Sequence, residues 1–214
     1  MKTIAMFGGS GGVGRVLYPL LEKKYNVISL GSKDVDVTDF SQVKNFFNNN
    51  DIDVVISLSG VNYNSKVAKI NEDNLQKVNK LLSVNVDGNI NVLSNSLDHM
   101  IPKNYGRIIG ISSVLSDIVV PSTALYSASK AFMDKLYEVA NKENLKYGIT
   151  CNTIQLGYWE AGMIEQLSDD FKKSVQNSIG LHRFGKTQEL ANAIDFIINT
   201  EYYCGNRMKL NGGI

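Results

Sequence analysis

The sequence predicts an α/β fold, a single doubly wound parallel sheet of about six strands with helices on both faces. Two observations carry this prediction. Short apolar runs alternate with longer segments of helical period, and no repeat, low-complexity linker or composition break divides the 214 residues. With 43% hydrophobic and 20% charged residues, the composition is that of one globular domain spanning residues 1–214.

The expected strands and helices alternate in chain order. Six short runs rich in apolar and β-branched residues are the expected strands: Thr3–Phe7, Asn26–Leu30, Asp53–Leu58, Gly106–Ser112, Ile149–Gln155 and Arg207–Leu210. Between most of them apolar residues recur every three or four positions, which predicts helices at Val13–Lys24, Val43–Phe47, Leu75–Met100, Ala124–Lys146 and Gln188–Asn199.

Charge and cysteine usage narrow the classes of function. The formal net charge is +1 with scattered charges, which does not predict a nucleic-acid or membrane-surface partner. Cys151 and Cys204 stand far from any metal-ligand spacing, so no metal site is expected. The opening MKTIAMFGG has too few apolar residues for a signal peptide, and no run approaches a membrane span. We therefore expect a cytoplasmic protein.

A glycine-rich loop joins the first expected strand to the first expected helix. Gly8, Gly12 and Gly14 give the spacing Gly-x-x-x-Gly-x-Gly, in a place where a dinucleotide pyrophosphate sits on a helix N-terminus. In such loops the first glycine permits a tight turn, the second lets the backbone approach the phosphates and the third lets the helix pack closely. The alternative is a flexible turn without a ligand, but the flanking strand and helix favour a dinucleotide site. The other candidates in this loop are Ser10, Gly11 and Val13.

Several segments resemble, in order, the motifs of the short-chain dehydrogenase/reductase family. The loop GGSGGVG is similar to the family's Thr-Gly-x-x-x-Gly-x-Gly with Phe7 in place of Thr, and VNVDG places Asn85 at the family's active-site asparagine. GRIIGISS ends at Ser113, thirteen residues before Tyr126, which is the family's serine-to-tyrosine spacing. CNTIQLGYWEAGM resembles its Asn-x-x-x-Pro-Gly segment. The resemblance covers nearly the whole chain and implies a Rossmann-like fold.

The resemblance implies a catalytic group of Asn85, Ser113, Tyr126 and Lys130. Tyr126 and Lys130 are one helical turn apart, so the ammonium is expected to lower the pKa of the phenol together with the cationic oxidised nicotinamide. Tyr126 would then act as general acid or base, and Ser113 would hydrogen-bond the substrate oxygen. By resemblance, Asn85 would hold a water that links Lys130 to solvent. Ordinary exposed helix packing is the alternative for the Tyr126–Lys130 pair.

The cofactor is expected to be NADP(H) rather than NAD(H). No acid precedes Asp34 near the end of the second strand, where an NAD-selecting carboxylate would stand, and Ser32 and Lys33 could donate to a 2′-phosphate. By resemblance, Asp36 and Val37 would contact adenine. The resemblance adds, as further cofactor contacts, Ser59, Gly60 and Gly157 together with Tyr126 and Lys130.

The chain also departs from the family pattern. ISLSG stands where the family has Asn-Asn-Ala-Gly, Leu156 replaces the proline, and Ala161 replaces a threonine that contacts nicotinamide. Only five residues separate Leu30 from Asp36, and a parallel crossover needs a dozen or more, so the family's third, edge strand is expected to be missing.

The resemblance implies an oxidoreductase for a small carbonyl or alcohol substrate, most like the 3-oxoacyl-acyl-carrier-protein reductases. A dinucleotide-binding scaffold with little turnover is the alternative, favoured mildly by the degraded motifs. An epimerase or dehydratase of the longer relatives is less expected, because little chain follows the last strand. Tyr158, Trp159 and Met163 fall where relatives cover the substrate, as a lid or as plain packing, and His99 and His182 are expected to be structural.

A homodimer or homotetramer is also expected. In relatives the two long helices pair with their copies across a two-fold axis. The apolar residues expected on that surface are Leu81, Leu82, Val92, Leu136 and Val139.

Overall fold

The structure, a computed structural model, describes residues 1–162 and 168–214 and contains one parallel sheet. The six strands have the order β2-β1-β3-β4-β5-β6, and every neighbouring pair is parallel. Their bounds are β1 Thr3–Phe7, β2 Asn26–Leu30, β3 Val54–Ser57, β4 Gly106–Ser113, β5 Ile149–Leu156 and β6 Arg207–Leu210. The expected fold class and all six expected strands are confirmed, to within a residue at the ends.

The helices follow the expected pattern with one addition. They are α1 Gly12–Leu21, α2 Phe40–Asn49, α3 Leu75–Leu82, α4 Gly88–Met100, α5 Ala124–Asn144, α6 Asp169–Ser178 and α7 Thr187–Asn199. Asp39 caps α2 by accepting hydrogen bonds from the backbone N–H groups of Ser41 and Gln42. Helix α6 was not predicted, because the sequence DDFKKSVQNS is mostly polar and offers few apolar residues from which to read a helical period.

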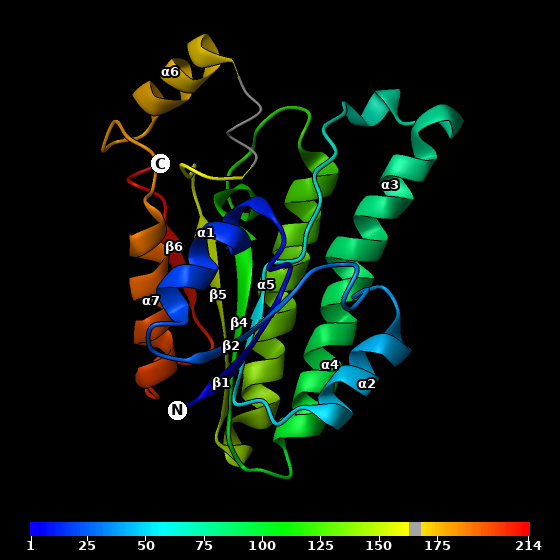
Figure 1. Ribbon diagram of the computed structural model, residues 1–214. Coiled ribbons are helices and arrows are strands. Elements are labelled where there is room, and N and C mark those ends of the chain that lie inside the picture. The colour runs from blue at the N-terminus through cyan, green and yellow to red at the C-terminus, as the bar shows by residue number, and fades with distance from the viewer. Residues whose placement is uncertain (163–167) are drawn as a thin grey trace.

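Helices cover the sheet on both faces, and each face has its own apolar core. Figure 1 shows α1 and α7 on one side of the sheet and α2, α4 and α5 on the other. Leu17 of α1 and Ile194 of α7 pack with Ile4 of β1 in the first core. In the second, Phe47 of α2 and Met133 of α5 pack with Phe7. Burial of these faces holds the helices on the sheet.

Strand β2 forms one edge of the sheet, so the family's third strand is missing as expected. After Leu30 the chain turns at once: the N–H of Gly31 donates to Asp34 Oδ2 at 2.7 Å, and the N–H of Asp34 donates to the Gly31 carbonyl at 3.0 Å. No residue from Asp34 to Val37 is in a strand. The nine residues between Leu30 and Phe40 therefore lead directly from β2 to α2.

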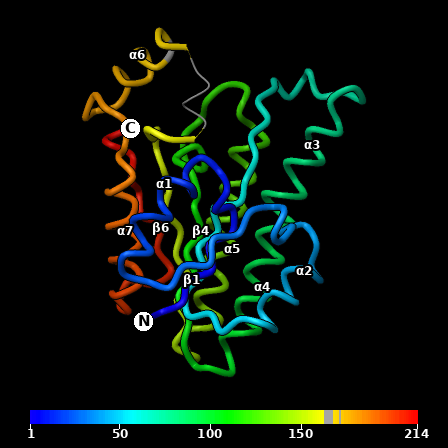
Figure 2. Tube along the Cα trace, in the orientation of Figure 1, coloured from blue at the N-terminus to red at the C-terminus, as the bar shows by residue number. Residues whose placement is uncertain are grey.

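The carboxyl ends of the strands form the functional edge. The strand order reverses beside β1, because β2 lies on one side of it and β3 on the other. Ligands of open parallel sheets bind outside the carboxyl ends at such a point. Figure 2 shows that the segments following β3, β4 and β5 rise at this same end.

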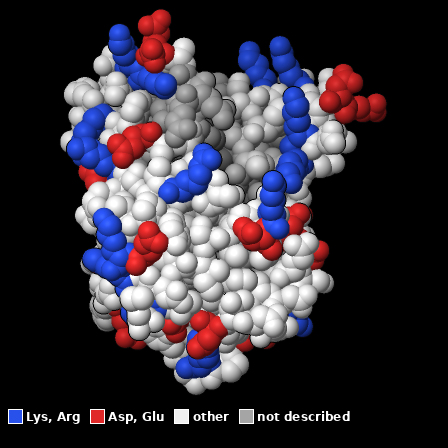
Figure 3. All heavy atoms as spheres, viewed as in Figure 1, with Lys and Arg blue, Asp and Glu red and all other residues white. Residues whose placement is uncertain are grey.

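The exposed residues differ in part from those expected at the assembly face. Leu81 and Val92 have no exposed surface and belong to the interior of the chain, so they cannot supply an interface. The exposed apolar residues of α3, α4 and α5 are Leu75, Leu82, Ile90, Phe132 and Val139. Figure 3 shows basic and acidic side chains interspersed over one face of the molecule. Within residues 1–162 and 168–214, none of the helices has the length and hydropathy needed to cross a membrane.

Candidate active site

The glycine loop leaves no room for a side chain at Gly8 or Gly14. Gly8 has a φ of +86°, and its N–H and that of Gly9 donate to the Leu30 carbonyl at 2.9 and 2.8 Å. A Cβ on Gly8 would lie 2.7 Å from the Ser59 backbone nitrogen. A Cβ on Gly14 would lie 2.6 Å from Gly9 Cα, so the third glycine lets α1 pack against the loop itself.

The amino end of α1 fits a phosphate group. Gly11 is its N-cap, no side chain caps it, and its first turn holds no acid. The first N–H groups of a helix have no partner within the helix, and the helix dipole favours an anion there. Beyond this end lies the segment after β5, since a Cβ on Gly12 would lie 2.4 Å from Gly162 Cα. Gly12 and Val13, both half-buried, would therefore meet a pyrophosphate through their backbone.

Side chains of both positive and negative charge follow the end of β2. Ser10 lies against it, because a Cβ on Gly31 would be 2.4 Å from Ser10 Oγ. Ser32 and Lys33 are exposed. Asp34 was outside the expected site, yet its carboxylate turns back onto the Gly31 N–H. An acid therefore does stand at the end of β2.

Asp36 and Val37 follow this turn. Asp36 Oδ1 accepts hydrogen bonds from the N–H and hydroxyl of Thr38 at 3.0 and 2.8 Å, and these bonds lower the pKa of Asp36. The side chain of Val37 is buried against α4, where a Cβ on Gly88 would lie 2.7 Å from its Cγ2. Only the backbone of Val37 could therefore contact an adenine ring.

Asn85 lies in a π-helical turn, Ser83–Asp87, between α3 and α4. It is 1% exposed and holds the segment after β3: Oδ1 accepts from the Val61 N–H at 2.8 Å, and Nδ2 donates to the Val61 carbonyl at 2.9 Å and to Ser129 Oγ at 3.0 Å. Its own carbonyl accepts from Asn89 Nδ2 at 2.9 Å. The side chain is thus used in holding the chain, and the expected water would have to use a remaining lone pair of Oδ1 or of this carbonyl.

Gly60 lies between Asn85 and Lys130. A Cβ on this exposed glycine would be 3.5 Å from Asn85 Oδ1 and 3.5 Å from Lys130 Nζ. Ser59 is half-buried beside the backbone of Gly8. The degraded Asn-Asn-Ala-Gly motif therefore still brings a glycine next to two expected catalytic residues.

Ser113 and Tyr126 meet at the carboxyl end of β4. They are 8% and 7% exposed, and the hydroxyl of Ser113 accepts a hydrogen bond from the Leu115 N–H at 3.2 Å. Burial raises the pKa of Tyr126, while a side-chain hydrogen bond with Ser113 acts in the opposite direction. The expected lowering of this pKa is therefore not a property of the chain alone, because desolvation of the phenolate dominates.

Lys130 lies one turn further along α5. Its Nζ is 5.8 Å from the centre of the Tyr126 ring and donates to the Ile111 carbonyl at 2.7 Å. The residue is 5% exposed, and burial lowers the pKa of its ammonium to about 8, against an opposing attraction from Asp134. The pKa of Lys130 therefore lies closer to neutrality than that of an ordinary lysine.

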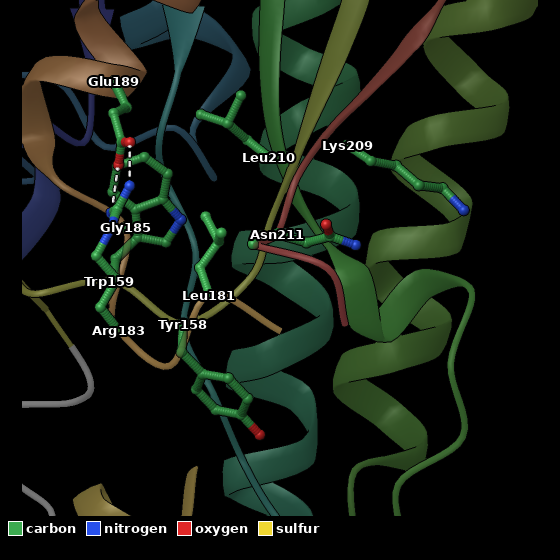
Figure 4. A pocket seen from close by; sticks show the side chains of 10 residues that line it. Tyr158, Trp159, Leu181, Arg183, Gly185, Glu189, Lys209, Leu210 and Asn211 are labelled. Atoms are coloured by element: carbon green, nitrogen blue, oxygen red, sulfur yellow. Dashed lines mark hydrogen bonds and ion pairs between the residues drawn. The ribbon is translucent and has the colours of Figure 1, made fainter. Parts of the chain in front are cut away.

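The segment after β5 lines a separate pocket of about 230 Å³ (Figure 4). Trp159 is 7% exposed and packs over Gly185, and Tyr158 is half-buried on the same wall. Arg183 and Glu189 close one side through two hydrogen bonds of 3.0 and 2.7 Å. None of the four expected catalytic residues lines this pocket. Trp159 therefore packs in the core as well as lining a pocket, and Met163 lies outside the described residues.

The remaining candidates lie apart from this group. Gly157 donates its N–H to the Leu210 carbonyl at 3.0 Å. It also packs against Asn211, at the start of the loop that follows β6. His99 accepts a hydrogen bond from the Ile52 N–H at 3.2 Å near the amino end of β3. His182 is exposed, with a φ of 51°. Neither histidine lies with the expected catalytic residues.

Comparison with known proteins agrees with this geometry. The model of the short chain dehydrogenase family matches residues 31–172. The 3-oxoacyl-[acyl-carrier-protein] reductase of Staphylococcus aureus is 27% identical over 243 residues, which cover 100% of this chain and 98% of that protein. Acetoacetyl-CoA reductase of Allochromatium vinosum is 32% identical over 165 residues, 76% of this chain and 66% of that protein.

A solved structure shares the fold over nearly its whole length. ElxO with NADP bound superposes with a TM-score of 0.87 at 20% identity, covering 99% of this chain and 97% of that one. The family match extends over well more than half of the chain, from the end of β2 to α6. This chain therefore belongs to the short-chain dehydrogenase/reductase family, as an NAD(P)-dependent oxidoreductase that interconverts a C=O and a CH–OH group.

Proposed function

We propose that Tyr126 exchanges the proton of the substrate oxygen, with Ser113 as its hydrogen-bonding partner. The observation that carries this proposal is the burial of both hydroxyl-bearing residues at the carboxyl end of β4, next to the buried ammonium of Lys130. When bound, the nicotinamide cofactor supplies or accepts the hydride. In the reduction direction the phenol of Tyr126 donates its proton to the developing alkoxide, which Ser113 stabilises with a hydrogen bond.

Lys130 and Asn85 support this proton transfer. The ammonium of Lys130 favours the phenolate that Tyr126 leaves behind, and its own pKa of about 8 suits proton exchange with solvent. Asn85 keeps the segment after β3 beside Lys130 through its two bonds to Val61. By resemblance, its carbonyl also holds the water that completes the proton path.

The proposed substrate is a 3-oxoacyl thioester. The Staphylococcus aureus and Allochromatium vinosum proteins are named for the reduction of this class of compound, and both are similar to this chain. Acetoacetyl-CoA is the simplest such compound to assay. NADPH oxidation should be measured with acetoacetyl-CoA, then with simple ketones and aldehydes, with a no-substrate control. Turnover of ketones without turnover of thioesters would exclude the proposed substrate, whereas no turnover of any carbonyl compound would favour a cofactor-binding scaffold.

We further propose NADP(H) as the preferred cofactor. Ser32 and Lys33 are exposed at the end of β2 and offer a hydroxyl and an ammonium to a 2′-phosphate. ElxO, which has the same fold, has a structure with NADP bound. Asp34 opposes this choice through its charge, although its carboxylate already accepts the Gly31 N–H. The loop from Gly8 to Gly14 would hold the pyrophosphate of either cofactor.

Finally, we propose that residues 1–214 act as one domain in a cytoplasmic homodimer or homotetramer. Helices α3, α4 and α5 expose apolar side chains on the face that relatives pair, including Phe132 at 37% and Val139 at 48% exposure. Pairing with a second copy would remove this surface from water. Light scattering at micromolar concentration measures the assembly, and a monomer would exclude it.

A further inference from the structure

Helix α5 carries a buried acid one turn beyond Lys130. Tyr126, Lys130 and Asp134 follow one another at intervals of four, so they lie along the same face of α5. Asp134 has no exposed surface. A buried carboxylate costs several kcal/mol unless hydrogen bonds and opposite charges compensate it, so the partners of Asp134 indicate why the helix carries it.

Asp134 is joined to Ser113 through two side chains. Gln155 of β5 is also fully buried, and its Nε2 donates to Asp134 Oδ2 at 2.8 Å and to Ser116 Oγ at 2.7 Å. The hydroxyl of Ser116 in turn donates to the main-chain oxygen of Ser113 at 2.8 Å. An unbroken path of hydrogen bonds thus runs from α5, across β5, to the main chain of Ser113.

Lys130 and Arg207 also attract this carboxylate. Asp134 Oδ1 accepts no hydrogen bond from any residue in the described part of the chain. Burial lowers the pKa of Lys130, and attraction to Asp134 opposes this effect. The hydrogen bond with Glu138 is the main cause of the raised pKa of Arg207, on β6, and attraction to Asp134 adds to it. Arg207 is also paired with Glu138 and lies 3.7 Å from Asp117, so the cation on that side is shared.

Within residues 1–162 and 168–214, the other groups that face Lys130 carry no charge in the physiological range. The Ile111 carbonyl faces it from β4, and Gly60 and Asn85 face it from the segments after β3 and α3. Tyr126 precedes it on α5 with a raised pKa, so this phenol stays neutral below its ordinary value of 10.0. Among the described residues, Asp134 is therefore the acid whose charge acts on Lys130.

We propose that Asp134 is a positioning residue of the active site. Acting through Gln155 and Ser116, it fixes the main chain of Ser113 relative to the helix that carries Tyr126. Its charge also keeps the neighbouring Lys130 protonated to a higher pH. The inference rests on the roles proposed above for Ser113, Tyr126 and Lys130. It extends them, because neither Asp134 nor Gln155 touches the reacting groups.

Two leucine variants separate positioning from simple stability. Gln155→Leu breaks the path to Ser113 at its centre. Asn141→Leu is the matched control, because Asn141 Oδ1 also joins α5 to β5, by accepting the Cys151 N–H at 3.0 Å, but leads to no active-site residue. Both variants should unfold at a lower temperature than the parent. A small displacement of a reacting group costs up to about 100-fold in rate, so Gln155→Leu should lower kcat by about 10- to 100-fold with NADPH affinity within twofold.

Asp134→Asn tests the charge while keeping an acceptor for Gln155. The measurement is the NADPH dissociation constant by fluorescence titration from pH 6.5 to 9.5, which needs no substrate. The resemblance to the family implies that the ammonium of Lys130 holds the nicotinamide ribose, so binding should weaken as this ammonium deprotonates. Without Asp134 this ammonium loses its proton more readily, and the weakening should begin about one pH unit lower than in the parent.

The outcomes are distinct. The inference is overturned if Gln155→Leu keeps the parental kcat, if Asn141→Leu loses as much kcat as Gln155→Leu, or if the pH dependence of Asp134→Asn matches that of the parent. Tyr126→Phe is measured in the same assay. If that variant also kept the parental rate, the proposed catalytic site itself would be wrong, whereas an inactive Tyr126→Phe beside a fully active Gln155→Leu would reject the positioning role alone.

Discussion

The ammonium of Lys130 donates a 2.7 Å hydrogen bond to the carbonyl of Ile111, two residues before Ser113 on β4. This contact joins α5, which carries Tyr126 and Lys130, to β4, which carries Ser113. These three proposed catalytic side chains are therefore held on two directly connected elements. It also explains how a buried lysine is tolerated, because the charge that burial disfavours meets a fixed acceptor. The site is thus assembled by packing and hydrogen bonds within the chain.

Tyr126→Phe should lower kcat by about 10²–10⁴-fold, the usual scale of general acid-base catalysis. The change removes the proposed proton donor, while the glycine loop that would hold the cofactor phosphates stays intact. Single-turnover hydride-transfer rates and NADPH titration measure the two effects separately. Tyr137→Phe is the control, since it removes a buried hydroxyl from the same helix without touching the site. Equal rates for Tyr126→Phe and the parent would show that Tyr126 is not the acid.

Lys33→Ala and Asp34→Asn should change cofactor preference in opposite directions. Loss of the Lys33 ammonium removes a favourable charge for a 2′-phosphate, so NADPH affinity should fall by about 5- to 10-fold while NADH affinity changes little. Asp34→Asn removes a nearby negative charge but leaves an oxygen for the Gly31 N–H, so NADPH should bind somewhat more tightly. Titration at matched ionic strength measures both. Tighter binding of NADH than NADPH by the parent would reverse the proposed preference.

The sequence was sufficient to predict the sheet and the place of the glycine loop. Strand periods, the glycine loop and the short link after Leu30 are local signals, and each corresponds to an observed element. The π-helical turn at Asn85 was not predictable, because VNVDG fits a continuous helix and the turn arises where Asn85 bonds Val61, 24 positions away. Likewise Asp34 reaches the end of β2 only because the chain turns back on Gly31.

Burial could not be assigned from helical period alone. Leu81 and Leu82 are adjacent on α3, yet Leu81 has no exposed surface and Leu82 is 40% exposed, since only one of them faces the interior. Val92 was expected on the outer face and is buried for the same reason. The path of hydrogen bonds from Asp134 to Ser113 was also not predictable, because it joins residues of three elements that lie about 20 or more positions apart in sequence.

Gly8→Ala should destabilise the chain by about 2–4 kcal/mol, because the φ of +86° strains an alanine and its Cβ would meet backbone at 2.7 Å. Gly11→Ala is the matched control from the same loop. Its φ of −72° suits any residue and the nearest contact of its Cβ would be 3.1 Å, so its cost should stay below about 1 kcal/mol. Denaturant unfolding measures both. Similar free energies of unfolding for the two variants would contradict the assigned loop geometry.

The buried ammonium of Lys130 should make stability depend on pH above neutrality. Burial lowers its pKa in the folded chain from 10.5 to about 8, so between these values the unfolded chain binds more protons than the folded chain. The free energy of unfolding therefore rises with pH through this window, by at most about 3 kcal/mol from this group.

Lys130→Met lacks the titrating group, so the parent should gain stability relative to it between pH 7 and 9.5. In the folded chain Tyr126, whose pKa is raised, stays protonated in this window, and its titration in the unfolded chain affects both proteins alike. Denaturant unfolding at pH 7, 8 and 9.5 measures the difference. A constant difference would mean that Lys130 keeps an ordinary pKa, and its proposed proton exchange near neutral pH would then lose its basis.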